Sequence, residues 1–268
     1  MSKKILLTIP AYNCEAQIGR VIKQVTPLFG EFIAEVLVID NRSSDGTLNK
    51  AVEEAELVDH MKVTVIQNNE NFSLGGTHKV AFKYCSAHNY SGVIILHGDD
   101  QGALIDFLSV LKDSTYKKYD CILGARFSKM SRLQGYSRTR VIGNHIFNWL
   151  YTLVAKDRVY DMGSGLNFYN ASLIDNGFYK LAPDDLTFNN YMLLASYAHK
   201  MKIYFKDISW REEDQVSNAK LFKQAFRLID FLFQFYFLRK KFISKDFRDT
   251  KRVEYEYNVI YSNNKMVE

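Results

Sequence analysis

The sequence predicts an α/β protein with a mostly parallel central sheet that is flanked by helices. Short apolar runs alternate with helical patterns four times before residue 113, which is typical of a parallel sheet covered on both faces. Each apolar run is also followed by a polar loop, at the position where open α/β sheets bind ligands. With 268 residues, of which 47% are hydrophobic, the chain is long enough to bury a substantial core.

Four pairs of strand and helix are expected in the first part of the chain. Apolar, β-branched runs predict strands at residues 4–9, 34–39, 62–67 and 92–96. Periodic apolar positions predict helices at residues 15–28, 45–57, 74–87 and 103–112. In the first of these helices Ile18, Ile22 and Val25 share one face, as expected of a helix that packs on a sheet.

The second part of the chain continues this pattern with longer polar interruptions. A fifth strand ends at Gly124-Ala125-Arg126, and a polar, basic loop follows at residues 128–140. Helices are expected at residues 141–153 and 188–200, and a strand at residues 202–208. The acidic pair Asp184-Asp185 fits the start of the second helix, with Asp185 or Thr187 as its cap.

A Phe-rich helix that ends in a basic cluster is expected at residues 220–242. Its longest uncharged run, residues 231–238, is too short to span a bilayer, whereas aromatic bulk beside Lys and Arg suits a membrane interface. Packing on the domain or in a dimer explains the same pattern. The tail from residue 244 to 268 is polar, and its β-like patch at residues 255–261 has no assigned place.

Composition narrows the partners and the compartment. A net charge of +5 fits an anionic partner such as a nucleotide, a phosphorylated lipid or a membrane surface. No dense basic stripe occurs before residue 200, which argues against nucleic acid. The three cysteines are far apart in the sequence and suggest reduced thiols in the cytoplasm. The apolar start at residues 5–9 is too short for a signal peptide, so we expect a soluble or peripheral protein.

The stretch Val93 to Gln101 is the strongest candidate for a binding site. It is a buried strand that ends in an imidazole, His97, and delivers Asp99, Asp100 and Gln101 to one sheet edge, where oxygen ligands can hold a divalent cation and a diphosphate. The alternative is a polar turn in which Asp99 or Asp100 caps the next helix. Polar loops at residues 10–13, 40–47 and 68–76 are expected to converge on the same edge.

Two of these loops suggest contacts with a nucleotide. Asp40 ends a strand and can accept a hydrogen bond from a ribose hydroxyl or a base N–H, although Ser44 and Asp45 also fit a helix cap. Gly75 and Gly76 permit close approach of the backbone to a ligand. Neither a Gly-x-Gly-x-x-Gly after the first strand nor a Gly-x-x-x-x-Gly-Lys-Ser/Thr segment occurs, which excludes the dehydrogenase and P-loop classes.

Five segments in order resemble family 2 glycosyltransferases of the GT-A fold, and within them the dolichyl- and polyprenyl-phosphate sugar synthases. The segments are Ile9-Pro10-Ala11-Tyr12-Asn13, Val38-Ile39-Asp40-Asn41-Arg42-Ser43-Ser44-Asp45-Gly46-Thr47, Asn71-Phe72-Ser73-Leu74-Gly75-Gly76, Leu96-His97-Gly98-Asp99-Asp100-Gln101 and Gly124-Ala125-Arg126-Phe127. The resemblance covers residues 4–217. It implies a GT-A domain at residues 1–218, with a nucleotide-sugar half at 1–101 and an acceptor half at 102–218, and a helical extension at 219–268.

The resemblance implies a donor site and a metal, either Mn²⁺ or Mg²⁺. The donor-binding residues that it implies are Pro10, Tyr12, Asn13, Asp40, Asn41, Gly75, Asp99 and Arg211. Asp99 matches the second acid of the family's Asp-x-Asp motif, Gln101 matches the amide after it, and His97 replaces the first acid. In the family, a loop with the spacing Arg-x-x-Gly-x-Ser-Lys closes over the diphosphate. Here Arg211 is present, but the spacing is broken, because Glu212, Gln215 and Asn218 occupy positions that are fixed in that motif.

The acceptor side implied by the resemblance follows residue 124. Its expected acceptor-binding residues are Arg138, Arg140, Asn144 and Ser164, and its expected catalytic residues are Asp99, Arg126 and Asp161. For a hydroxyl acceptor, Asp161 is the candidate general base. For a phosphate acceptor no base is needed, and Asp161 would orient the acceptor or brace Arg138.

These expectations define an enzyme and two alternatives. The preferred function is metal-dependent, inverting transfer of a sugar from a nucleotide sugar to a polyprenyl phosphate at the cytosolic face of a membrane. Transfer to a saccharide hydroxyl in surface polysaccharide synthesis is the alternative within enzymes. Because His97 replaces an acid, a nucleotide-sugar binding protein without catalysis is the alternative from another class. A homo-oligomer is compatible with each of them.

Overall fold

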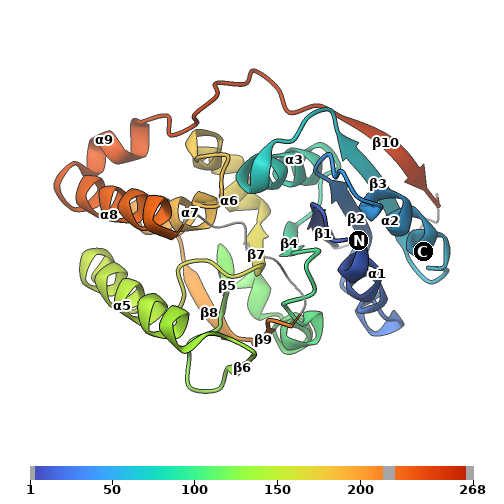
Figure 1. The fold of residues 1–268 in the computed structure, drawn as a ribbon, viewed down its shortest axis with the longest axis horizontal. Coiled ribbons are helices and arrows are strands. Elements are labelled where there is room, and N and C mark those ends of the chain that lie inside the picture. Colours follow the sequence, from blue (N-terminus) through green and yellow to red (C-terminus); the bar gives the residue numbers. More distant parts are fainter. Residues whose placement is uncertain (1–3, 214–220, 264–268) are drawn as a thin grey trace.

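One eight-stranded sheet, in the order β10-β3-β2-β1-β4-β7-β5-β8, forms the centre of the molecule (Figure 1). The structure is a computed structural model that describes residues 4–213 and 221–263. The strands are β1 Ile5–Ala11, β2 Ile33–Asp40, β3 Lys62–Asn68, β4 Gly92–Leu96, β5 Cys121–Ala125, β7 Leu166–Asn170, β8 Ile203–Asp207 and β10 Tyr257–Ser262. A separate two-stranded sheet pairs β6 Arg132–Gln134 with β9 Ser209–Arg211 in parallel.

Strands β1 to β4 pair in parallel with one another, and β5 and β8 form a second parallel pair in the same sheet. β1 pairs in parallel with β2 and β4, and β2 pairs in parallel with β3. Every residue of β1 and β4 is buried, as expected of parallel strands covered on both faces. β7 and β10 run antiparallel to their neighbours. The predicted fold class, an α/β protein with a mostly parallel sheet, is confirmed.

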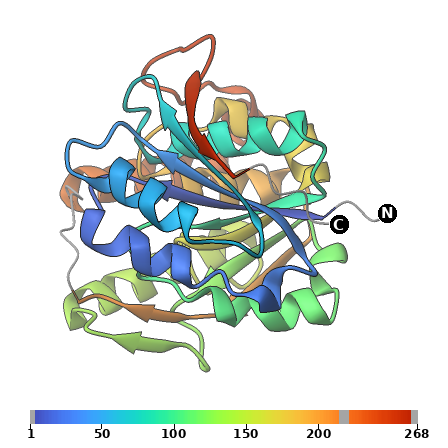
Figure 2. The ribbon, with the colours of Figure 1, turned by 90° about the vertical axis from the view of Figure 1, so that its right-hand side faces the viewer.

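Helices cover both faces of the sheet and enclose two hydrophobic cores. They are α1 Glu15–Lys23, α2 Thr47–Glu56, α3 Ser73–Ala87, α4 Leu108–Lys112, α5 Arg138–Ala155, α6 Ala171–Asn176, α7 Phe188–Ala198, α8 Leu221–Phe237 and α9 Arg239–Ser244. One core contains side chains of α1, α2 and α4, and the other contains side chains of α3, α6, α7 and α8. Figure 2 views the molecule from the side of α1, α2 and β10.

The clearest departures from the sequence prediction are in two helices and one strand. The first helix ends at Lys23, because Pro27 opens a separate 3-10 turn at Pro27–Phe29. The helix expected at residues 103–112 is a 3-10 turn at Leu104–Phe107 followed by the short α4. Strand β7 was not predicted, since its alternation of Asn with Leu, Phe and Tyr gives no continuous apolar run.

The carboxy-terminal part is not a single helix. The helix expected at residues 220–242 divides at Leu238 into α8 and α9, and residue 220 and the expected domain boundary at 218 lie outside the described residues. α8 buries Leu228, Phe231 and Phe235 in the core beside α7. The β-like patch at 255–261 forms β10, which pairs with β3. Among the described residues, no helix is both long and apolar enough to cross a membrane.

Candidate active site

A pocket of about 300 Å³ lies at the carboxyl ends of the parallel strands β1, β2, β3 and β4. It is lined by Pro10, Ala11, Tyr12, Cys14, Asn41, Asn71, Ser73, Leu74, Thr77, His97, Gly98, Asp99, Asp185 and Leu186. The four strand-end loops expected to converge therefore do so. Open α/β sheets bind their ligands at this edge.

Asn41 holds two of the loops together. Its side-chain amide donates to Oδ1 of Asn71 at 2.9 Å, and its own Oδ1 accepts from Nδ2 of Asn68 at 2.9 Å and from the backbone N–H of Phe72 at 2.8 Å. A carboxylate at this position would lack the donor that reaches Asn71. Asn41 therefore shapes the wall of the pocket as well as lining it.

Asn13 connects the first two loops without lining the main pocket. Its Oδ1 accepts from the backbone N–H of Ser44 at 2.8 Å, and its own N–H donates to Oγ of Ser43 at 3.0 Å. Its φ of 48° lies in the left-handed region that non-glycine residues rarely adopt. Asn13 borders a second, open cavity between α1 and α2. The structure therefore places Asn13 beside the expected donor-binding loop, with Pro10 and Tyr12 on its pocket side.

His97 and Asp99 line the pocket from the end of β4. Burial lowers the pKa of His97 to about 3, so its imidazole is neutral near neutral pH. Its Nε2 is buried and has no hydrogen-bond partner within the described part of the chain. Burial and the neighbouring charge of Asp100 raise the pKa of Asp99 to about 6. A neutral imidazole and a desolvated carboxylate are chemically suited to bind a divalent cation.

The described side chains alone do not supply a full set of metal ligands. No cluster of three or more His, Cys, Asp or Glu side chains arranged to hold a metal occurs in the described ranges. Gln101 is half-buried, lies outside the pocket lining and donates its backbone N–H to Oδ1 of Asp99 at 3.3 Å. His97 and Asp99 therefore fit a cation whose remaining ligands are water or phosphate oxygens.

Asp100 is the buried centre of an ion-pair cluster whose two arginines are partly exposed. The interpretation of Asp100 as a helix cap is wrong, because its carboxylate accepts from Arg20 Nε at 2.6 Å and Gln24 Nε2 at 3.0 Å and pairs with Arg211. Arg211 Nε also donates to the carbonyl oxygen of Asp100 at 2.8 Å. Arg211, which was expected at the donor diphosphate, is therefore bound to Asp100, the neighbour of Asp99 in the sequence. Its side chain is half-exposed.

Two expected donor contacts are occupied by the protein itself. Asp40 is fully buried and accepts from Gln67 Nε2 at 2.9 Å and from the backbone N–H of Ser43. The interpretation of Gly75 needs correction: its N–H donates to the carbonyl oxygen of Asp184 at 2.6 Å, and a Cβ there would lie 2.4 Å from the carbonyl oxygen of Pro183. The close approach that Gly75 permits is to this backbone, and Gly75 does not line the pocket.

Arg126 and Asp161 form a buried pair between β5 and β7. Arg126 Nε and Nη2 donate to Asp161 at 2.7 and 2.8 Å, and the backbone N–H of Arg126 adds a third bond at 2.9 Å. Trp210 and Phe127 lie against the guanidinium, with ring centroids at 5.0 and 5.1 Å. The Asp161 charge raises the pKa of Arg126 despite burial. Asp161 therefore braces Arg126, which is a different arginine from Arg138, the one it would brace under one of the alternatives for a phosphate acceptor.

The expected acceptor residues are divided between the surface and the interior. Arg138 is exposed at the first turn of α5 and forms no ion pair with a described residue. Arg140 pairs with Glu212 at 2.7 Å and lies over the ring of Tyr136. Asn144 donates to the carbonyl oxygen of Arg140 at 2.7 Å. Ser164 is buried, and its hydroxyl donates to the carbonyl oxygen of Leu166.

Sequence reasoning missed part of the pocket lining. Asn71 lies in the loop before α3, and Ser73 and Thr77 lie in the first turns of that helix, where the glycines give the stronger sequence signal. Asp185 and Leu186 come from the turn before α7, and Asp185 accepts from Thr187 at 2.8 Å as a local turn residue does. The local pattern around Asp185 is that of a helix start, so it carried no signal of a pocket.

Solved structures of one enzyme share this fold. Glucosyl-3-phosphoglycerate synthase from Mycobacterium tuberculosis in complex with UDP matches with a TM-score of 0.62 and 16% identity, over 87% of this chain and 79% of that chain. The same enzyme in complex with Mn²⁺, UDP-glucose and glycerol 3-phosphate matches with a TM-score of 0.61 and 16% identity, over 87% and 79%. Its complex with phosphoglyceric acid has a TM-score of 0.62 at 17% identity, over 87% and 80%. At this identity the likeness shows the fold.

A family model identifies the chain more closely than these structures do. Comparison with curated protein sequences returned no match. The model described as "Glycosyl transferase family 2" matches residues 7–178, which include the strand-end loops of the pocket, Arg126 and Asp161. The match spans more than half of the chain, and the fold agrees with it. The protein is therefore a glycosyltransferase that belongs to glycosyl transferase family 2.

Proposed function

We propose that this enzyme transfers a sugar from a nucleotide sugar to a polyprenyl phosphate, with the help of a divalent cation. The donor would occupy the pocket between Pro10, Asn41 and Asp99. Its position at the strand ends and its polar rim suit a nucleotide diphosphate. The structurally similar synthase forms complexes with UDP and with UDP-glucose, which makes a uridine nucleotide the first donor to test.

His97 and Asp99 would hold the cation, together with oxygens of the donor diphosphate. When bound, the cation would offset the negative charge that develops as the nucleoside diphosphate leaves. The unpartnered Nε2 of His97 and the desolvated carboxylate of Asp99 support this assignment. The similar synthase forms a complex that contains Mn²⁺, a metal that accepts imidazole more readily than Mg²⁺ does.

The pairing of Asp161 with Arg126 is the observation that favours a phosphate acceptor over a hydroxyl acceptor. A hydroxyl acceptor needs a group that removes its proton, but both oxygens of Asp161 already accept hydrogen bonds from Arg126. A phosphate oxygen is anionic and needs no base. The exposed guanidinium of Arg138 can contact such an anion, and the similar synthase binds phosphorylated small molecules.

Exposed apolar side chains on two adjacent helices favour a lipid-linked acceptor. α5 and α8 lie side by side in Figure 1. Their exposed large apolar residues are Ile142, Ile146, Trp149, Leu153, Phe226, Ile229, Phe233, Tyr236 and Phe237. The exposed basic residues Arg239 and Lys240 begin α9, one residue after the end of α8. Aromatic side chains beside basic ones suit the interface of an anionic membrane, where a polyprenyl phosphate resides.

A donor and acceptor screen tests the proposal. Purified protein is given UDP-glucose or GDP-mannose with Mn²⁺ or Mg²⁺, and release of nucleoside diphosphate is measured with a short polyprenyl phosphate, 3-phosphoglycerate or a saccharide. We expect metal-dependent release that the polyprenyl phosphate accelerates most. Acceleration by the saccharide alone would replace the acceptor with a hydroxyl. Tight donor binding without turnover or metal dependence would favour a binding protein, and the absence of any donor effect would overturn the proposal.

A further inference from the structure

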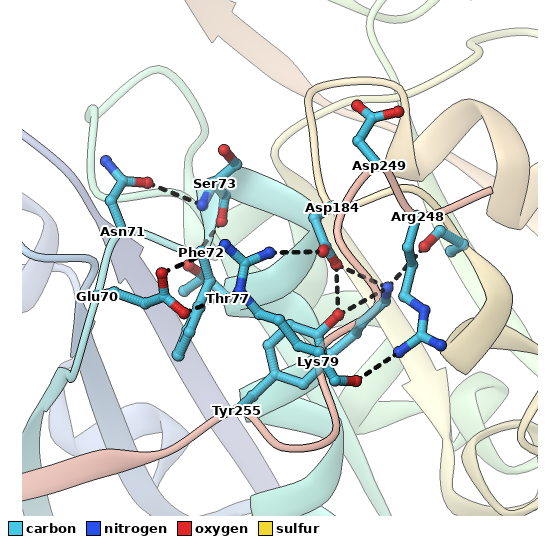
Figure 3. A network of polar contacts seen from close by, with 12 residues as sticks. Glu70, Asn71, Phe72, Ser73, Thr77, Lys79, Asp184, Arg248, Asp249 and Tyr255 are labelled. Atoms are coloured by element: carbon cyan, nitrogen blue, oxygen red, sulfur yellow. Dashed lines mark hydrogen bonds and ion pairs between the residues drawn. The ribbon is translucent and has the colours of Figure 1, made fainter. Parts of the chain in front are cut away.

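Asp184 connects parts of the chain that are far apart in sequence. Its carboxylate accepts from Lys79 Nζ and from the Tyr255 hydroxyl, both at 2.7 Å, and from Arg252 Nη1 at 3.1 Å. Figure 3 shows Lys79, Asp184 and Tyr255 pointing toward one another. Lys79 is 4% exposed, so this network replaces the hydration of a buried ammonium group.

The same residue caps the helix that starts at the pocket. The carbonyl oxygen of Asp184 accepts from the N–H groups of Gly75 and Gly76 at 2.6 and 3.2 Å. These N–H groups belong to the first turn of α3, where backbone donors lack partners within the helix. The position of Asp184 therefore fixes the start of α3, beside the pocket-lining Ser73 and Leu74.

The segment of residues 245–256, which we term the C-terminal strap, contacts the loop that precedes α3. Arg252 Nε donates to Glu70 Oε1 at 3.0 Å, and its guanidinium lies over the ring of Phe72, 5.4 Å from the centroid. The ring of Tyr255 meets Phe72 edge to face at 5.2 Å. Arg252 thus connects the loop before α3 with Asp184 across a gap in sequence of more than a hundred residues.

A second arginine holds the opposite wall of the pocket. Arg227 of α8 pairs with Oδ2 of Asp185 at 2.7 Å and donates to the carbonyl oxygen of Phe247, in the strap, at 3.1 Å. Asp185 and its neighbour Leu186 line the pocket. Residues of α8 and the strap therefore contact two of the loops that border the pocket, and among the described residues after 220 none lines the pocket itself.

We infer that Arg252 and Tyr255 of the C-terminal strap are positioning residues for the donor pocket. Tyr255 holds Asp184 beside Lys79, and Arg252 bridges Asp184 to Glu70. This clamp holds the 70–74 and 184–186 loops at the spacing that the donor requires. The inference deepens the proposed function, because it takes the pocket to be the nucleotide site. A preorganised pocket binds its ligand more tightly, since fewer loop conformations are lost on binding.

Three variants and a matched control test the clamp. Arg252→Ala removes the contacts to both Asp184 and Glu70, Tyr255→Phe removes one hydroxyl and keeps the ring on Phe72, and Arg252→Lys retains the charge. Glu254→Ala is the control, because Glu254 lies in the same strap and pairs with Lys83, where both side chains are more than half exposed. UDP with Mn²⁺ is the probe for calorimetry, and UDP-glucose is the substrate for kinetics.

We expect Arg252→Ala to weaken UDP binding and raise KM about tenfold while kcat changes less than about threefold, because ground-state binding is affected and the reacting groups remain. Tyr255→Phe is expected to change KM about threefold in the same sense, Arg252→Lys to recover part of the loss, and Glu254→Ala to behave as the wild type. A loss of kcat with unchanged KM, or unchanged UDP binding in both Arg252→Ala and Tyr255→Phe, would overturn the inference.

Hydrogen exchange separates failure of this inference from failure of the proposed function. Backbone amides of residues 70–76 and 184–187 are expected to exchange faster in Arg252→Ala and Tyr255→Phe than in Glu254→Ala. If the wild type does not bind UDP but these amides respond, the clamp exists and the assigned donor is wrong. If the wild type binds UDP and the amides do not respond, the clamp is wrong. If Arg252→Ala does not fold, hydrogen exchange in Tyr255→Phe is compared with that in Glu254→Ala instead.

Discussion

The guanidinium of Arg126 and the carboxylate of Asp161 form a two-pronged pair in which Nε and Nη2 lie 2.7 and 2.8 Å from the two carboxylate oxygens. Asp161 is 1% exposed and Arg126 is 11% exposed. Oδ1 of Asp161 also accepts from the backbone N–H of Gly163 at 3.0 Å. This carboxylate is therefore committed to holding Arg126 and is poorly placed to collect a proton.

Replacement of Asp161 tests this role. Asp161→Asn leaves the buried Arg126 charge without its counterion, which we expect to cost about 3 kcal/mol of unfolding free energy. Turnover should fall, but the pH dependence of kcat/KM should keep its shape, because no base has been removed. Urea unfolding and a pH profile measure the two effects. Loss of an ascending acidic limb in the variant, with stability unchanged, would instead identify Asp161 as a general base.

Asp99 should reduce the stability of the metal-free protein near neutral pH. Its pKa is raised from 3.8 to about 6 by burial. The protonated form is therefore favoured by folding: the contribution to stability is full below pH 3.8 and is lost as the pH rises through about 6. Asp99→Asn should then raise the unfolding free energy by about 1 to 3 kcal/mol near pH 7 and change it little near pH 4.

Thermal denaturation without metal at the two pH values measures this difference. The same variant should lose the stabilisation that Mn²⁺ with UDP gives to the wild type. An Asp99→Asn protein that is less stable than the wild type near neutral pH would show that burial does not strain this carboxylate.

His97 should determine which metal the enzyme prefers. An imidazole ligand suits Mn²⁺ better than Mg²⁺, whereas a carboxylate supplies the oxygen that Mg²⁺ prefers. His97→Asp should therefore raise the ratio of Mg²⁺-supported to Mn²⁺-supported turnover about tenfold, because a better-matched ligand strengthens Mg²⁺ binding. Nucleoside diphosphate release at saturating donor gives the ratio. His97→Ala is the control, and equal ratios in all three proteins would place His97 outside the metal shell.

The sequence predicts the parallel half of the fold and the edge that holds the site. Strands β1, β2 and β4 are largely apolar, β3 is rich in Val and Ile, and most residues of the four strands are buried, which makes the pattern plain. The end of such a run fixes where His97 and Asp99 lie, because parallel strands deliver their ends to one edge. Asn41 was placed at the same edge for the same reason, and the structure shows it lining the pocket.

What the sequence could not predict depends on contacts between distant residues. Asp184 looks like a helix start by local rules, yet its partners Lys79 and Tyr255 lie 105 and 71 residues away. Asp100 looks like a turn residue, yet it binds Arg20 and Arg211, which lie near the beginning and the end of the domain's sequence. Such pairs leave no periodic signal, since each partner is polar and isolated in its own stretch of sequence.

Arg138 and Arg140 should respond differently to removal. Arg138 is exposed, and we expect Arg138→Ala to raise the KM for a polyprenyl phosphate about fivefold without changing the melting temperature, since it would remove one contact to phosphate. Arg140 is held by Glu212 and Tyr136, so Arg140→Ala should cost about 1 kcal/mol of stability. Steady-state kinetics and thermal denaturation on both variants test this division. A raised acceptor KM in Arg140→Ala alone would reverse the assignment.

The exposed apolar side chains of α5 and α8 should bind an anionic membrane. Trp149 and Phe233 are 59% and 56% exposed, and each would bury its ring in the lipid interface. Removal of both rings, in the double variant Trp149→Ser and Phe233→Ser, should weaken binding to vesicles that contain phosphatidylglycerol about tenfold or more, since each buried aromatic contributes of order 1 kcal/mol. Leu57→Ser is the matched control, because Leu57 is 73% exposed at the end of α2.

Cosedimentation with the vesicles measures binding. High salt should weaken the binding of the wild type, because salt screens the attraction between the basic residues after α8 and the anionic lipid. If the wild type does not sediment with these vesicles and instead dimerises through these helices, their apolar side chains serve a second copy of the chain.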